Sequence, residues 1–203
     1  FGSAADWISL NNDPGVYFDP PAADGSKVLL TDTDHLCGVC GDRAWVWRTF
    51  LRGHNPIFMD AYDGAGYGVG GEGFRFDDPA WVGARLNMGY TLRYANRMGL
   101  AGTLPRGDLA SSGYCLARAV ADGARYLVYL PEGGSVSVDL SAAQGALATE
   151  WLNPATGAVA AGAPTSGGAN RSFTAPFAGD AVLYIYQPAR PRQYVPLVTL
   201  GAR

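Results

Sequence analysis

Basic clusters and long apolar runs are both missing from this chain of 203 residues. Lys27 is the only lysine, and the net charge is −3. Proteins that bind nucleic acid or an anionic membrane surface through charge carry a basic cluster, so we expect neither partner. A membrane-spanning helix needs roughly 20 consecutive apolar residues, and no segment approaches that length. The sequence therefore predicts a globular protein that binds neither nucleic acid nor membrane.

Cysteine is scarce, and the start of the chain lacks a secretory signal. Phe1 is followed by neither a charged nor an apolar segment, so we expect no signal peptide in this chain and expect the chain to begin inside a longer protein. Cys37 and Cys40 form a Cys-x-x-Cys pair, while Cys115 lies far away. This pair leaves a zinc or redox role open, but a structural zinc site takes four ligands, usually in two paired spacings. We favour plain thiols or a local disulfide, and expect no metal and no cofactor.

Aromatic residues and glycine are abundant. Aromatic residues make up 12% of the chain, with five Trp and eleven Tyr, and there are 28 Gly. This composition is typical of carbohydrate-active proteins, which stack sugar faces on exposed rings. The alternative is that the rings pack inside the fold, and composition alone does not separate the two.

The first half of the sequence alternates strand and helix patterns. Short apolar runs predict strands over residues 5–10, 27–31 and 56–60. Asp42 is a good N-cap for a helix over residues 43–52, and a second helix is predicted from Asp78 onward. Residues 11–26, rich in Asn, Asp, Pro and Gly, are predicted to form a loop. The order indicates a parallel α/β fold, either a barrel or a doubly wound sheet.

The second half carries strand patterns alone, separated by turns that contain Gly, Pro or Asn. Strands are predicted over residues 114–120, 125–130, 135–140, 148–152, 172–175 and 181–186. Short alternating strands at this density favour an antiparallel β-sandwich. We therefore place an α/β domain at residues 1–103, a β-sandwich at 104–188 and a tail at 189–203.

Carboxylates follow two of the strands predicted in the α/β half. Asp32 and Asp34 come after the second strand, and Asp60 ends the third. In a (β/α)₈ barrel the strand ends form one pocket, and cleavage of a glycosidic bond requires two carboxylates about 5–9 Å apart. Asp34 and Asp32 are the candidate catalytic residues. An Asx-turn that caps the following loop is the alternative for Asp32.

Four further residues are candidates for substrate binding. His35 can position a sugar hydroxyl, although a structural histidine remains the alternative. Asp60 and Tyr62 stand at the next strand end. Trp47 lies two positions after Trp45 on the predicted helix, so the two rings cannot share a face; we expect Trp45 in the core and Trp47 at a rim or interface.

Several motifs resemble a known enzyme group. Residues 32–36 (DTDHL), 41–47 (GDRAWVW) and 52–60 (RGHNPIFMD) resemble the end of the barrel in apiosidase-like glycoside hydrolases. Residues 105–117 (PRGDLASSGYCLA), 126–131 (YLVYLP) and 151–157 (WLNPATG) are similar to the small β-sandwich that follows that barrel and is often labelled a collagen-binding domain.

The resemblance implies a fold and a function. The chain would be the C-terminal portion of a (β/α)₈ TIM barrel followed by the sandwich, with the N-terminal portion of the barrel missing. The whole protein would be a secreted glycoside hydrolase, extracellular or periplasmic, that acts on a polysaccharide, and this fragment would be inactive alone. A non-catalytic carbohydrate-binding, matrix-binding or structural module is the first alternative. A metal or redox protein built on the cysteine pair is the second.

Overall fold

The computed structural model describes residues 2–10, 14–33, 36, 40–59 and 79–189. Within the described residues, the N-terminal part includes the strands β1 (Trp7–Ser9), β2 (Val28–Asp32) and β3 (Asn55–Ile57) and the helices α1 (Pro14–Phe18), α3 (Arg43–Leu51) and α4 (Pro79–Met98). The strands and the two longer helices lie where apolar periodicity predicts them. The short helix α1 lies in a segment that the sequence predicts to be a loop.

The three N-terminal strands form a parallel sheet in the order β1-β2-β3. Ile8 pairs with Leu29 and Thr31 pairs with Pro56, so β2 is the central strand. Helix α3 connects β2 to β3, as a parallel connection requires. The Asp42 side chain accepts a hydrogen bond of 2.7 Å from the backbone N–H of Trp45 and caps the start of α3.

The C-terminal part is a β-sandwich. Its elements are β4 (Leu104–Pro105), the 3₁₀ turn η1 (Gly107–Leu109), β5 (Cys115–Arg118), β6 (Arg125–Leu130), β7 (Ser135–Asp139), β8 (Ala146–Leu152), β9 (Val159–Ala161), β10 (Thr165–Ser166), β11 (Asn170–Thr174) and β12 (Ala181–Tyr186). Seven strands form a large sheet in the order β10-β8-β12-β6-β5-β4, with β9 beside β8. A small sheet consists of β7 and β11. All pairs within these two sheets are antiparallel, as the strand patterns predict.

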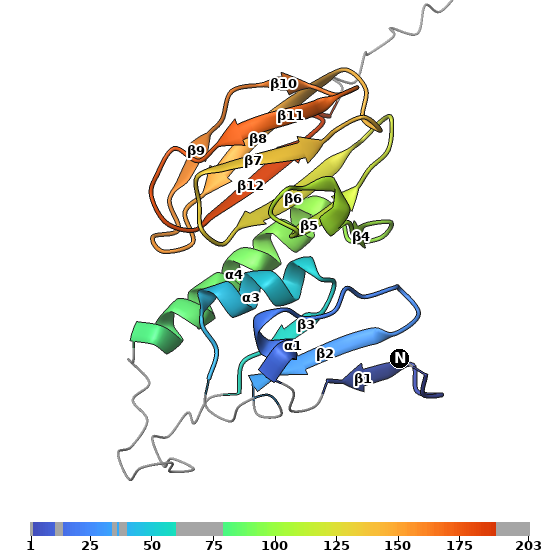
Figure 1. The fold of residues 1–203 in the computed structure, drawn as a ribbon, viewed down its shortest axis with the longest axis vertical. Helices are drawn as coiled ribbons and strands as arrows, with labels where there is room; N and C mark the ends of the chain where they lie inside the picture. The colour runs from blue at the N-terminus through green and yellow to red at the C-terminus, as the bar shows by residue number, and fades with distance from the viewer. Residues whose placement is uncertain (1, 11–13, 34–35, 37–39, 60–78, 190–203) are drawn as a thin grey trace, which may run out of the picture.

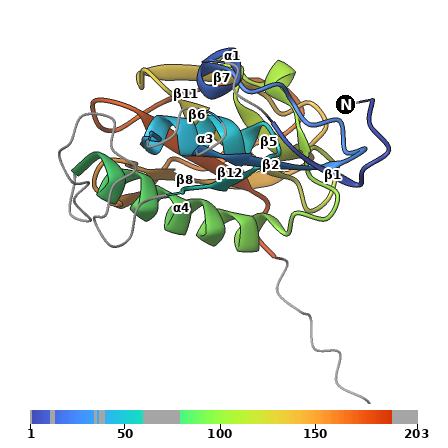
Figure 2. The same cartoon turned by 90° about the horizontal axis from the view of Figure 1, so that it is seen from below.

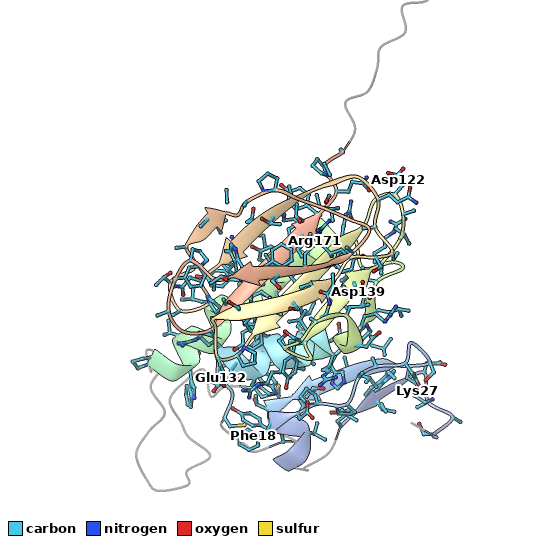
Figure 3. The ribbon with its side chains drawn as sticks, turned by 45° about the horizontal axis from the view of Figure 1, so that its top comes forward. Phe18, Lys27, Asp122, Glu132, Asp139 and Arg171 are labelled. Carbon is cyan, nitrogen blue, oxygen red and sulfur yellow. The ribbon has the colours of Figure 1, made fainter. Side chains whose placement is uncertain are left out.

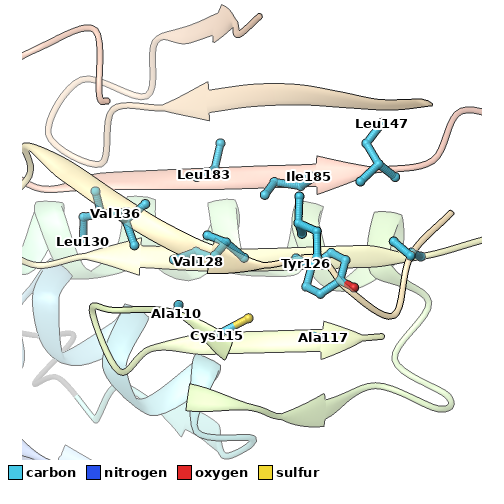
Figure 4. Close-up of a cluster of buried hydrophobic side chains, with 14 of the residues drawn as sticks. Ala110, Cys115, Ala117, Tyr126, Val128, Leu130, Val136, Leu147, Leu183 and Ile185 are labelled. Carbon is cyan, nitrogen blue, oxygen red and sulfur yellow. The ribbon is translucent and has the colours of Figure 1, made fainter. Parts of the chain in front are cut away.

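Both faces of the large sheet are buried. On one face, side chains such as Val128 and Leu183 pack against Val136 of the small sheet (Figure 4). On the other face, Leu127 and Tyr184 pack in a cluster with residues from α3 and α4. The helices therefore serve as a second covering layer for the sandwich.

Helices α3 and α4 lie between the parallel sheet and the sandwich (Figure 1). They run beside each other in contact, α3 above the parallel strands and α4 along one border (Figure 2). Helix α3 uses different side chains for its two neighbours. Trp45 packs on the side of the parallel sheet with Leu36 and Ala84, and Trp47 packs against the sandwich.

Two polar clusters close the joint between the helices and the sandwich. Arg43 at the start of α3 pairs with Asp180 at 3.0 Å, and the Tyr129 hydroxyl donates to the same carboxylate at 3.1 Å. At the other end of the joint, Arg97 of α4 forms an ion pair with Glu150 of β8. Charged hydrogen bonds of this kind fix the orientation of the elements they join.

Candidate functional site

The residues of β2 alternate between a buried and a less buried face of the parallel sheet. Leu29, Thr31 and Thr33 are 2%, 0% and 0% exposed. This is the face on which the helices lie (Figure 1). Val28 is 53% exposed, and Asp32 stands on the same face because alternate residues of a strand point to one side. In a closed (β/α)₈ barrel the face opposite the helices is the interior.

Asp32 is the last residue of β2 and is partly buried. Its Oδ2 accepts a hydrogen bond of 2.9 Å from Oγ of Ser9, the last residue of the neighbouring strand β1. The bond joins the carboxyl ends of two neighbouring strands and holds the Asp32 carboxylate at that edge of the sheet. Sequence reasoning missed Ser9, although it stands two residues after Trp7, the spacing of one strand face.

The helix-covered face of β2 carries a buried histidine contact. Nε2 of His54 lies 2.7 Å from the carbonyl oxygen of Pro21, which only accepts, so Nε2 carries the proton. Nδ1 then accepts from the Thr31 hydroxyl at 2.8 Å. Burial is the main reason that the pKa of His54 is lowered, which keeps the ring neutral. His54 is thus a structural residue, consistent with the turn role that its place after a helix indicates.

Thr33, the residue just beyond the end of β2, has its hydroxyl group in a hydrogen bond with the segment that follows β3. It accepts a hydrogen bond of 2.9 Å from the backbone N–H of Met59, which follows β3. The contact draws the segments after β2 and β3 together.

Most of the predicted site residues fall on segments that are not described. Asp34, His35, Asp60 and Tyr62 lie outside the described residues. Asp32 is described, and it stands at a strand end as expected. The gathering of carboxylates at one strand edge therefore stays a prediction.

The position of Trp47 contradicts its predicted role in substrate binding. Its ring is 0% exposed, and its Nε1 donates a hydrogen bond of 2.8 Å to Oδ1 of Asn87 on α4. Asn87 in turn donates to the carbonyl oxygen of Pro154 in the sandwich at 3.0 Å. A ring without exposed surface cannot stack on a sugar, so Trp47 is an interface residue, and its predicted role in substrate binding is wrong.

The cysteines show no sign of a metal centre in the described segments. Cys40 is disulfide-bonded, and Cys115 is a free thiol buried in the sandwich core. No group of three or more potential metal ligands occurs among the described residues. None of the helices described is long and apolar enough to cross a membrane.

Comparison with known proteins gives one family match and two structural neighbours. Residues 108–185 match the family described as "Putative collagen-binding domain of a collagenase". The match lies in the sandwich. One solved structure with this fold is called "Glycoside hydrolase"; it is 14% identical, with a TM-score of 0.56 over 81% of this chain and 43% of that one.

A second solved structure is a glycoside hydrolase family 5 protein from Bacteroides vulgatus ATCC 8482. It is 15% identical, with a TM-score of 0.57, and the match covers 82% of this chain and 43% of that chain. The chain thus spans less than half the length of either neighbour. At this identity the likeness concerns the fold. No curated protein matches the chain.

Proposed function

We propose that this chain is the C-terminal part of a glycoside hydrolase, called the parent protein below. Residues 1–103 would complete a (β/α)₈ barrel together with an upstream portion, and the sandwich would brace the last barrel helices. The parent protein cleaves a glycosidic bond in a polysaccharide. Asp34 and Asp32 supply the catalytic carboxylates, with His35, Asp60 and Tyr62 around the substrate, and the chain alone is inactive.

The observation that carries the proposal is a face of the parallel sheet that none of the described elements covers. Trp7 and Val28 are 59% and 53% exposed there and pair with each other across β1 and β2. Among the described strands, β1 and β3 each pair on one side only. Large apolar side chains and open strand edges favour burial by further protein. An upstream part of the same barrel would cover both.

The chemistry that suits Asp32 and its neighbours is acid–base or nucleophilic attack at a sugar. One carboxyl group must donate a proton to the leaving oxygen while the other stays ionised. Ser9 donates to Asp32, and a hydrogen bond to a carboxylate favours its ionised form. Asp32 therefore suits the ionised partner better than the acid.

Secretion of the parent protein is part of the proposal. The disulfide at Cys40 supports it, because disulfide bonds persist in oxidising compartments such as the periplasm and the cell exterior. The second candidate function is a non-catalytic binding or structural module. The family match of residues 108–185 favours this alternative for the sandwich.

Hydrolysis by the parent protein tests the proposal. Release of reducing sugar from a panel of plant and microbial polysaccharides is measured for the wild type, Asp34→Asn and Asp32→Asn. We expect Asp34→Asn to lower turnover by about 10²–10⁴-fold with unchanged unfolding. Asp139→Asn is the control, because Asp139 lies in the sandwich and accepts a hydrogen bond from the backbone N–H of Ser141, which Asn keeps.

The outcomes separate the two candidate functions. Near-normal turnover of Asp34→Asn would remove Asp34 from the mechanism. A wild type that binds polysaccharide but releases no sugar would replace the enzyme proposal with the binding module.

A further inference from the structure

A cleft of about 450 Å³ lies where the helices meet the sandwich. Phe18 at the end of α1 and Arg48 of α3 form one wall, and Tyr114, Glu132 and neighbouring serines of the sandwich form the other. Figure 3 shows Phe18 and Glu132 at this junction. We infer that the cleft is a second, non-catalytic binding site for a neutral oligosaccharide segment of a polysaccharide chain.

The aromatic part of the cleft is exposed yet anchored. Phe18 is 63% exposed, and its ring meets Tyr17 edge-on with 5.0 Å between ring centres. Tyr17 stacks in turn on the buried Trp45 at 6.4 Å. A large apolar ring left open to solvent but held from below is a suitable platform for the apolar face of a sugar ring.

Two charged side chains line the cleft. Among the described residues, the guanidinium of Arg48 and the carboxylate of Glu132 make no hydrogen bond or ion pair. Arg48 supplies hydrogen-bond donors and Glu132 supplies acceptors. Sugar hydroxyl groups both donate and accept, so one ligand can satisfy both residues.

Hydroxyl groups along the sandwich wall add further donors. Oγ of Ser111 accepts a hydrogen bond of 3.0 Å from the backbone N–H of Ser137. Its own hydroxyl hydrogen is not used in that bond and can point to a ligand. Arg48 and Glu132 carry opposite charges, so together they give the cleft no net positive charge that would favour a uronic acid. The set of groups therefore suits a neutral sugar.

The cleft is held in shape by contacts that cross the joint. Asp19 follows Phe18 and pairs with Arg52 of the α3 end at 3.0 Å. The Tyr114 hydroxyl donates to the same carboxylate at 3.3 Å, and the Arg52 guanidinium lies 4.9 Å from the centre of the Tyr114 ring. The walls come from both halves of the chain, so the site exists only when the two halves are packed together.

The cleft is separate from the candidate catalytic position. It lies on the sandwich side of α3, whereas Asp32 stands on the opposite, uncovered face of the parallel sheet. A ligand here would hold the polymer and leave the reaction to the strand ends. The inference rests on the proposed function only for the choice of glycans as probes.

Affinity electrophoresis of the parent protein tests the site. Native gels contain soluble xylan, glucomannan or arabinan, with polygalacturonate as the acidic comparison. We expect retardation by at least one neutral polysaccharide, and about tenfold weaker binding for Phe18→Ala and for Glu132→Gln. Asp122→Asn makes the same charge change at the far end of the sandwich from Glu132 (Figure 3) and should bind as the wild type does.

Hydrolysis of a short soluble substrate, measured in parallel, keeps the two proposals apart. Phe18→Ala should hydrolyse it at the wild-type rate, since Phe18 lines the cleft and is not one of the proposed catalytic or substrate-binding residues at the strand ends. Retardation that is equal in the wild type, Phe18→Ala and Glu132→Gln overturns the inference even if hydrolysis occurs. So does stronger retardation by polygalacturonate, or none by any neutral polysaccharide. If the wild type binds polysaccharide but hydrolyses none, and the two variants lose this binding, the result supports the binding site and contradicts the proposed hydrolase activity.

Discussion

The two faces of the large sandwich sheet are equally buried but differently built. The face toward the small sheet is mainly aliphatic, with Val128, Leu183 and Ile185 against β7. The face toward α3 and α4 is rich in aromatic rings with hydroxyl groups, including Tyr129 and Tyr184. One face is the interior of a sandwich, and the other is a joint between two parts of the chain.

The tyrosine hydroxyl groups sharpen this contrast. On the helix side, Tyr129 donates to Asp180, Tyr94 to Glu150, and Tyr184 to the carbonyl oxygen of Arg97. On the sandwich side, the buried Tyr126 hydroxyl has no partner among the described residues. Burial raises the pKa of Tyr126 to about 12 and raises the pKa of Tyr129 further, so both stay neutral. The joint therefore specifies orientation through polar contacts, whereas the sandwich interior relies on packing.

The largest expected effect comes from removing one leucine from each face. Leu127 and Leu183 are both 0% exposed, on adjacent strands, and they face the helices and the small sheet respectively. Each change to Ala should lower the free energy of unfolding by about 2–5 kcal/mol. Urea unfolding followed by tryptophan fluorescence measures it, with the 63%-exposed Leu92→Ala as control.

The same pair shows whether the two halves unfold together. A single transition that shifts in both variants is expected for one cooperative unit. If Leu127→Ala lowered the free energy of unfolding by no more than Leu92→Ala does, the sandwich would fold independently of the helices, and the contact between them would add no stability.

A smaller effect is expected at the Arg43–Asp180 contact. Asp180 is 7% exposed and accepts from both Arg43 and Tyr129, so Asp180→Asn should cost about 1–3 kcal/mol. Asp108→Asn removes the matched exposed pair with Arg106 and should change little, because solvent screens it. Equal effects in the two variants, measured by urea unfolding, would mean that the joint gains nothing from its buried charge.

The smallest effect is the pH dependence from His54. Its pKa is lowered in the folded protein, so the unfolded chain takes up the proton first as the pH falls. The contribution of neutral His54 to the free energy of unfolding is complete at pH values above its ordinary pKa of 6.5, and it is lost as the pH drops below that value. His54→Gln has a donor and an acceptor but does not titrate, so its stability should change less between about pH 7.5 and 5.

Urea midpoints of wild type and variant across that range measure the difference. The titration of Glu150, another partly buried group, lies outside this pH range. Burial raises its pKa, but the hydrogen bonds from Arg97 and Tyr94 outweigh burial and lower it, so its contribution is lost only below its ordinary value of 4.5. Parallel pH curves for the two proteins would remove His54 from the pH response.

Regular periodicity predicted most of the elements, and its absence explains the misses. The alternating strands β6, β7 and β12 and the helices α3 and α4 lie where their patterns place them. Helix α1 has five residues that include Pro14 and Gly15, too few for a helical period. Strands β9 and β10 are short and rich in small residues, so no alternation marks them.

The candidate site was less predictable than the fold. The place of Asp32 at the end of β2 is predictable, because a carboxylate that follows an apolar run is a local signal. Its contact with Ser9 spans 23 residues and depends on strand pairing. The burial of Trp47 has a related reason: the pattern of a helix predicts one buried side, whereas α3 is buried on two.

The sequence by itself determined which residues of β6 share a face of the sheet. Tyr126, Val128 and Leu130 lie on one face, and Leu127 and Tyr129 lie on the other. That follows from the period of two in any strand. Only the tertiary structure decided what covers each side, because the small sheet and the helices come from distant parts of the sequence. The burial of an apolar face requires a partner, but the face itself does not specify which one.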